Sequence, residues 1–183
     1  MSNSPLFPLP VAPHWHTANE VVVPEAHLKN WLQDTGSLTE RLQAHCRHFE
    51  VQLLGQQKTQ LSADELEIIG SQLSVVREVI LRGDGQPWVA ARSVLPKALT
   101  EDGPFAALGS QSLGRILFND HLFERRPFEL CQLEAPNLLE TLGCESKHRL
   151  FGRRSLFCYQ HWRVMVAEIF LPQCPAYKLW SPR

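Results

Sequence analysis

The sequence predicts an α+β domain, with an antiparallel sheet of about six strands and helices on one face of it. Apolar and β-branched runs come mostly in pairs, as expected of hairpins, and helical patterns fall in two groups between them. The clearest pair is residues 75–81 and 88–95, which Asp84-Gly85 joins. Asp-Gly between such runs is a strong hairpin signal, because both residues tolerate a positive φ. We expect the rest of the sheet to be arranged around this hairpin.

Length and charge limit the possible partners. The chain has 183 residues, the size of one domain, with 18 basic and 19 acidic residues and a formal net charge of −1. Because there is no basic stripe, we expect a small-molecule partner rather than nucleic acid or an anionic membrane surface. No apolar run reaches the roughly 18 residues of a membrane helix, and the first residues lack a signal-peptide pattern. We therefore expect no membrane insertion and a cytoplasmic location.

The N-terminal part is predicted to be a lead-in followed by two helices. Residues 1–24 hold five of the 13 prolines and no apolar period, so we expect an extended segment over the domain surface. Apolar residues at helical spacing predict a first helix around residues 28–32. A second helix begins soon after it, because Ser37 and Glu40 form a capping-box pattern, and its unpaired amides gather near Leu38.

The middle of the chain is predicted to alternate between strands and helices. Residues 49–54 alternate as a strand, and residues 63–69 follow a second capping-box pattern. After the central hairpin, composition predicts helix as far as residue 119, with glycine interruptions. Within this stretch Ser112 is a good N-cap for a helix that begins at Leu113, and such a start presents unpaired N–H groups to an anion. An ordinary cap that binds water is the alternative.

The C-terminal part is predicted to contain a strand, a linker and a second hairpin. The strand covers residues 121–133, and the linker, with a short helix, covers residues 134–147. The hairpin consists of residues 155–159 and 163–172, and a basic turn with Arg153 and Arg154 comes just before it.

Two charged residues within apolar strands are the candidates for a ligand site. Arg77 is the only charged residue on its face of the strand, so it needs an anion, unless it lies on the surface or pairs with a nearby carboxylate. In a simple hairpin register Arg77 lies opposite Arg92, and a shared anionic ligand would relieve their repulsion. Glu168 interrupts the apolar run 164–171, where it lies either on an exposed edge or buried beside a donor. The basic turn could supply a second cation.

No metal or cofactor is predicted. The five cysteines are widely spread and include no Cys-x-x-Cys pair, so neither a disulfide framework nor a zinc site is indicated. His45, Cys46 and His48 are close in sequence, but no further ligand is arranged around them.

Four blocks of the sequence resemble the bacterial chorismate pyruvate-lyases in their order and approximate spacing. The blocks are residues 76–96, 112–118, 152–155 and 167–172. On this basis residues 25–177 are expected to form the enzyme-like domain, after the lead-in of residues 1–24 and before a tail of residues 178–183.

The resemblance implies a cofactor-independent lyase that converts chorismate to 4-hydroxybenzoate and pyruvate, the first step of ubiquinone biosynthesis. It also implies a six-stranded antiparallel sheet, with the ligand buried beneath two helical flaps and a product that leaves slowly and inhibits. We expect the enzyme to be a monomer.

The resemblance also assigns roles to individual residues. Arg77 is expected to bind the ring carboxylate and Glu168 the hydroxyl group, and the backbone amides of Leu38 and Leu113 to add to the carboxylate contacts. Leu38 stands where the family has methionine, a change that a backbone contact tolerates. The remaining carboxylate, on the enolpyruvyl group, could meet one of three arginines: Arg92, Arg153 or Arg154.

The alternative function is a non-catalytic sensor domain of the same fold that binds a small acid. Such domains usually follow a DNA-binding helix-turn-helix region, and the residues before the first predicted helix are too few and too rich in proline to form one. We therefore favour the enzyme.

Overall fold

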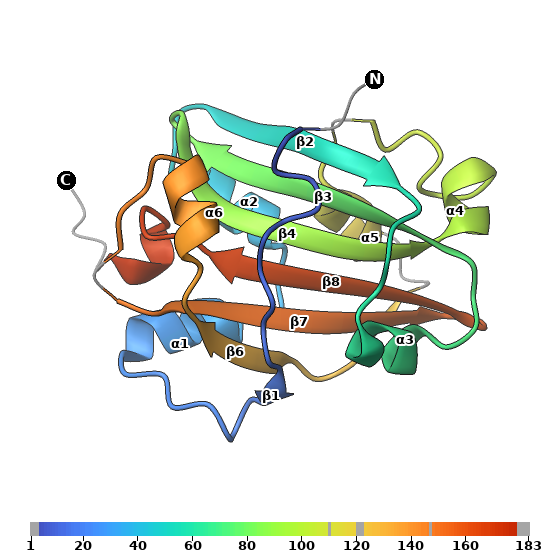
Figure 1. The fold of residues 1–183 in the computed structure, drawn as a ribbon, viewed down its shortest axis with the longest axis horizontal. Coiled ribbons are helices and arrows are strands. Elements are labelled where there is room, and N and C mark those ends of the chain that lie inside the picture. The colour runs from blue at the N-terminus through green and yellow to red at the C-terminus, as the bar shows by residue number, and fades with distance from the viewer. Residues whose placement is uncertain (1–3, 110, 120–122, 147, 179–183) are drawn as a thin grey trace.

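One antiparallel sheet runs through the structure and has helices on both sides (Figure 1). The computed structural model describes residues 4–109, 111–119, 123–146 and 148–178. Within them the sheet has eight strands in the order β1-β6-β7-β8-β4-β3-β2, and β5 pairs with β7. The strands are β1 (His16–Thr17), β2 (Phe49–Gln57), β3 (Ser74–Gly83), β4 (Gln86–Pro96), β5 (Glu124–Arg125), β6 (Glu129–Leu133), β7 (Leu150–Tyr159) and β8 (Trp162–Phe170).

The predicted number of strands, six, is too low. β1 was not expected, and the strand predicted over residues 121–133 is two strands, β5 and β6. β1 and β5 have two residues each, which is too short for a recognisable alternation of side chains. Residues 121 and 122 of the predicted strand lie outside the described part of the chain.

The helices are short. They are α1 (Ala26–Leu32), α2 (Leu38–Gln43), α3 (Ala63–Ile69), α4 (Lys97–Glu101), α5 (Leu113–Asn119), α6 (Pro136–Thr141) and the 3-10 helix η1 (Pro175–Tyr177). Both capping patterns mark a helix start, although only α3 has the full capping box; at α2 the Ser37 side chain accepts from the Glu40 amide. The helix predicted to continue to residue 119 is instead α4 and α5 with turns between them.

The central hairpin is confirmed, but its register differs from the simple one. Asp84 and Gly85 form the turn with φ of 48° and 79°. Arg77 lies opposite Ser93, and Glu78 lies opposite Arg92. The register shifts between Leu81 and Arg82, where β4 contains one extra residue, and such a bulge moves every later pair by one position. The predicted repulsion between Arg77 and Arg92 is therefore wrong.

The predicted basic turn before the last hairpin is part of strand β7. Arg153 pairs with Glu168 across the ladder, and Arg154 pairs with Ala167. Because successive side chains of a strand point to opposite faces, these two arginines lie on different sides of the sheet.

Both faces of the sheet are covered, so the prediction of helices on one face is wrong. Helices α1, α2, α4 and α5 pack on the face that carries Arg77, here called the Arg77 face. Helices α3 and α6 pack on the opposite face, here called the Glu78 face. An amphipathic pattern shows that a helix buries one side, but not which face of a sheet it meets.

The proline-rich N-terminal segment lies across the Glu78 face. Leu6 and Leu9 are buried there, and the Leu9 amide donates to the Glu78 carboxylate at 2.7 Å. In Figure 1 this segment, coloured dark blue, crosses in front of the sheet before it reaches β1, which pairs with β6. Turns and bends interrupt its course, and the segment forms part of the hydrophobic core.

None of the described helices has the length and apolar character needed to span a bilayer. Of the predicted tail, residues 179–183 lie outside the described part of the chain.

Gly152 on β7 packs tightly against β8, the strand that carries Glu168. A Cβ at this position would lie 2.5 Å from Ile169 Cδ1 and 2.9 Å from the carbonyl oxygen of Glu168. We expect Gly152→Ala to lower the free energy of unfolding by about 1–3 kcal/mol, since a backbone atom cannot easily move away. Chemical denaturation measures this loss. The control is Gln132→Ala on neighbouring β6, an exposed position where a change within about 0.5 kcal/mol is expected; equal effects of both variants would contradict the packing argument.

Candidate active site

A cavity of about 50 Å³ lies between the Arg77 face of the sheet and helices α2 and α5. All four residues predicted to bind substrate line it, namely Arg77, Glu168, Leu38 and Leu113. The other lining residues are Thr39, Val51, Val79, Leu81, Ala91, Ser93, Gln111, Ser112, Gly114, Leu117, Arg125, Phe157 and Val166. The lining is mostly apolar, which strengthens electrostatic interactions inside the cavity.

Arg77 on β3 supplies a buried positive charge. Its side chain is 2% exposed and donates to Gln56 Oε1 at 3.0 Å, to the Gly109 carbonyl at 2.9 Å and to the Gln111 carbonyl at 3.0 Å. These acceptors are neutral, and within the described residues no carboxylate pairs with this guanidinium. Burial lowers the pKa of Arg77 to about 10. An anion in the cavity would compensate this charge.

Glu168 on β8 lies at the other end of the cavity. Its carboxylate accepts from Arg153 Nε at 2.6 Å, and the two side chains are 14% and 1% exposed. Arg153 in turn donates to the carbonyls of Asp34 at 2.8 Å and of Trp31 at 3.3 Å. Glu168 is therefore largely buried beside a donor, the second of the two situations expected from the sequence, and it is held in a fixed position.

The register of the sheet sets the separation between Arg77 and Glu168. Arg77 pairs with Ser93, Ser93 pairs with Val166, and Glu168 lies two residues further along the same face of β8. Two strand spacings and two residues correspond to about 12 Å between the Cα atoms of Arg77 and Glu168. The small side chains of Ala91 and Ser93 line the cavity between them.

The starts of α2 and α5 cover the cavity from the other side. Leu38 and Leu113 are the first residues of these helices, and the first amides of a helix have no intrahelical acceptor. A hydrogen bond of 2.5 Å between the hydroxyls of Thr39 and Ser112 joins the two helix starts. The predicted backbone donors therefore come together over one cavity although they are far apart in the sequence.

Arg125 on β5 is a cavity residue that the sequence analysis missed. Its guanidinium donates to Ser155 Oγ at 3.2 Å and to the Thr35 carbonyl at 3.1 Å, and lies 4.2 Å from the centre of the Phe128 ring. Burial, and secondly the charge of Arg153, lowers the pKa of Arg125 to about 10. Its neighbours Glu124 and Arg126 are exposed, so the segment looks like a charged surface loop, and only the alternation of a strand could have indicated that Arg125 points inward.

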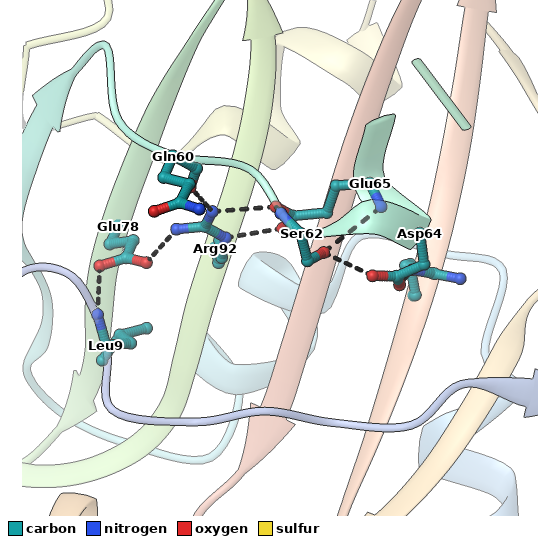
Figure 2. A network of polar contacts seen from close by, with 8 residues as sticks. Leu9, Gln60, Ser62, Asp64, Glu65, Glu78 and Arg92 are labelled. Atoms are coloured by element: carbon teal, nitrogen blue, oxygen red, sulfur yellow. Dashed lines mark hydrogen bonds and ion pairs between the residues drawn. The ribbon is translucent and has the colours of Figure 1, made fainter. Parts of the chain in front are cut away.

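Arg92 and Arg154, two of the three predicted contacts for a second carboxylate, lie on the Glu78 face, away from the cavity. Figure 2 shows Arg92 between Glu78, at 2.8 Å, and Glu65, at 2.7 Å. Arg154 pairs with Glu129 at 2.7 Å and with Asp64. Both arginines hold α3 against the sheet, and Arg154 also lies 5.1 Å from the centre of the Trp15 ring in the N-terminal segment. This part of the prediction is therefore wrong. Arg153 alone of the three is on the Arg77 face.

The charges in and beside the cavity are unequal. Of the described residues, Arg77, Arg125 and Arg153 supply three positive groups and Glu168 one carboxylate, which gives a formal charge of +2 for this set. Most of the lining is apolar, and the ends of the cavity differ in their polar groups. The arrangement fits a small ligand that carries negative charge.

Solved structures share the fold at low sequence identity. The effector domain of PhnF from Mycobacterium smegmatis matches with a TM-score of 0.57 and 14% identity, over 76% of this chain and 90% of that one. The ligand-binding domain of a GntR-family transcriptional regulator from Bordetella bronchiseptica matches with a TM-score of 0.53 and 14% identity, over 69% of this chain and 86% of that one. At this identity the likeness concerns the fold alone.

Sequence comparisons are far closer. A probable chorismate pyruvate-lyase of Pseudoalteromonas atlantica is 45% identical, over 90% of this chain and 89% of the relative. Another, of Pseudomonas aeruginosa, is 40% identical over 86% of this chain and 90% of the relative. The sequence profile described as chorismate lyase matches residues 9–180. The chain therefore belongs to the chorismate lyase family.

Proposed function

We propose that this protein is a chorismate pyruvate-lyase, which splits chorismate into 4-hydroxybenzoate and pyruvate. The observation that supports this most is the buried Arg77 at one end of a cavity whose other end holds Glu168: among the described residues, its hydrogen-bond acceptors are all neutral. Chorismate carries one carboxylate on its ring, a hydroxyl group at the opposite ring carbon, and a second carboxylate on the enolpyruvyl ether. Its two carboxylates and its hydroxyl group match the charged side chains at the two ends of the cavity.

Arg77 binds the ring carboxylate in this proposal. A guanidinium can form two parallel hydrogen bonds with a carboxylate, which fixes both the position and the plane of the ring. The amides of Leu38 and Leu113 donate to the same carboxylate. The carbonyls of Gly109 and Gln111 hold Arg77 and also belong to the segment before α5, so binding at Arg77 is coupled to the position of this helix.

Glu168 binds the ring hydroxyl and assists the removal of the proton from the carbon that carries this hydroxyl group. Loss of this proton and of the enolpyruvyl group makes the ring aromatic, so the reaction is strongly downhill. The enzyme then has mainly to orient the substrate and exclude water. No metal or organic cofactor has a step in this scheme.

Release of 4-hydroxybenzoate requires α2 and α5 to separate, since they cover the cavity. We propose that these helices act as flaps, that release limits turnover, and that the product inhibits competitively. A monomer in the cytoplasm that supplies ubiquinone biosynthesis remains our expectation.

The non-catalytic sensor is the weaker hypothesis. The regulatory domains that resemble this chain share its fold at 14% identity, whereas the relatives at 40–45% identity carry the name of the lyase.

Replacement of the anchoring cation tests the binding of the ring carboxylate. We expect Arg77→Ala to lower kcat/KM for chorismate by about 100-fold and to weaken 4-hydroxybenzoate binding to a similar degree, because both molecules carry this carboxylate. Pyruvate release and calorimetry measure the two effects. Arg82→Ala, on the same strand but on the other face, is the matched control and should have little effect. Near-normal turnover of Arg77→Ala would disprove the anchoring role.

Glu168→Gln tests the role in proton movement. We expect kcat to fall by about 100-fold, because glutamine accepts a hydrogen bond but cannot take a proton. The dissociation constant of 4-hydroxybenzoate should rise less than about tenfold. Glu129→Gln is the control, since it removes a carboxylate from Arg154, a similarly buried arginine of β7, on the other face of the sheet. Full activity of Glu168→Gln would disprove the role in proton movement and would show that Glu168 contributes a hydrogen bond only.

Thr39→Val tests the closure of the flaps. Removing its hydrogen bond to Ser112 should speed the dissociation of 4-hydroxybenzoate about fivefold, since one such bond contributes about 1 kcal/mol. Stopped-flow displacement of the product measures this rate. The control is Thr100→Val on α4, whose hydroxyl donates only within its own helix. An unchanged rate would show that the two helices do not open at this contact.

A further inference from the structure

We propose that Arg125 binds the enolpyruvyl carboxylate of chorismate and stabilises the negative charge that develops on the departing group. This inference rests on the function proposed above. It assigns the second carboxylate of the substrate to a residue that neither the sequence pattern nor the comparisons single out.

The chemistry of chorismate places the second carboxylate near Glu168. The enolpyruvyl ether is attached to the ring carbon next to the one that carries the hydroxyl group. If Glu168 holds the hydroxyl and Arg77 holds the ring carboxylate, the enolpyruvyl group must lie at the Glu168 end of the cavity. A cation is required there, because an uncompensated carboxylate in an apolar cavity is costly.

Arg125 has the right position for this contact. It lines the cavity together with Glu168, and β5 carries it beside β7, where it pairs with Phe157. The nearby negative charge of Glu168 acts to raise the pKa of Arg125, against the lowering that burial causes. Arg125 and Glu168 are therefore close enough for one substrate to reach both.

The side chain of Arg125 is held in place before substrate binds. Ser155 and the Thr35 carbonyl accept two of its N–H groups, and its guanidinium lies over two aromatic rings, 4.2 Å from the centre of Phe128 and 5.1 Å from that of Phe157. Such packing leaves a planar cation little freedom and suits it to a fixed carboxylate. Arg153 also lies 4.9 Å from the Phe128 ring, so two positive groups approach one another here, and an anion would reduce their repulsion.

Arg153 is less suited to the contact, although it lies on the same face. Unlike Arg125, it does not line the cavity, and its Nε is already paired with the Glu168 carboxylate at 2.6 Å. Arg153 therefore acts as a positioning residue for Glu168.

The proposed contact also assists the reaction itself. The ether C–O bond breaks, and its electron pair leaves on the oxygen as the enolate of pyruvate. The C–H electron pair of the hydroxyl-bearing carbon completes the aromatic ring, and the released proton ends on the enolate carbon as part of the pyruvate methyl group. No other reactant is needed. Because the enolate is attached to the carboxylate that Arg125 holds, the guanidinium lies near the charge that develops.

The test compares chorismate with 4-hydroxybenzoate, which lacks the enolpyruvyl group. We expect Arg125→Gln to lower kcat/KM for chorismate by about 30- to 100-fold and to change the dissociation constant of 4-hydroxybenzoate by less than about threefold. Arg125→Lys, which keeps the charge but not the planar fork, should lower kcat/KM about tenfold. If the glutamine variant does not fold, Arg125→Lys is used for the same comparison. The matched control is Arg126→Gln at the exposed neighbouring position, which should match the wild type.

The outcomes separate the two proposals. If the wild type is active, two results contradict the role of Arg125 and leave the proposed function standing. In the first, the Arg125 variants keep normal kcat/KM; in the second, they lose chorismate turnover and 4-hydroxybenzoate affinity in the same proportion. A wild type that releases no pyruvate from chorismate contradicts the proposed function, and the role of Arg125 with it. Selective loss with chorismate supports both.

Discussion

The site depends on a guanidinium that is buried without a carboxylate among the described residues. Arg77 is 2% exposed, and the acceptors of its hydrogen bonds in the described part of the chain are one amide oxygen and two backbone carbonyls. Charged groups are rarely buried unless they are paired, so this arrangement favours occupation of the cavity by an anion. The two carbonyls belong to the segment that leads into α5, and thus the same charge helps to position a helix that covers the cavity.

The alternation of side chains along the strands separates the remaining charges into two groups. Arg153 and Glu168 lie on the Arg77 face and contribute to the cavity, whereas Glu78, Arg92 and Arg154 lie on the Glu78 face. Glu78 and Arg92 belong to the polar network of Figure 2, which also holds the N-terminal segment through the Leu9 amide. Adjacent residues of one sequence block therefore have different tasks, binding on one side and structure on the other. From charge in the sequence alone, Glu78, Arg92 and Arg154 would be mistaken for a binding site.

Much of the fold could be predicted, and the failures have physical reasons. The Asp-Gly hairpin, the helix starts at Ser37, Ser62 and Ser112, and the C-terminal hairpin follow from local rules of turns and caps. The register of the central hairpin does not follow from such rules, because a single bulge residue moves every pair and leaves no clear mark in the sequence. Two-residue strands and the choice of sheet face for each helix depend on contacts between distant parts of the chain.

The candidate site was predictable where the pattern of one strand was informative. Arg77 and Glu168 stand out because each interrupts an apolar run, and the family resemblance led to Leu38 and Leu113. Arg125 did not stand out, since it lies between exposed charges in a strand of two residues. Its position becomes visible only when β5 pairs with β7.

The central claim is that this cavity converts chorismate, and the most direct measurement follows both products together. Purified protein is mixed with chorismate, and pyruvate and 4-hydroxybenzoate are quantified over time in the wild type and in Arg77→Ala. If the cavity converts chorismate, the wild type yields equal amounts of both products and the variant yields neither. Binding of 4-hydroxybenzoate without release of either product above the spontaneous rate would contradict it and would indicate a sensor that shares the fold.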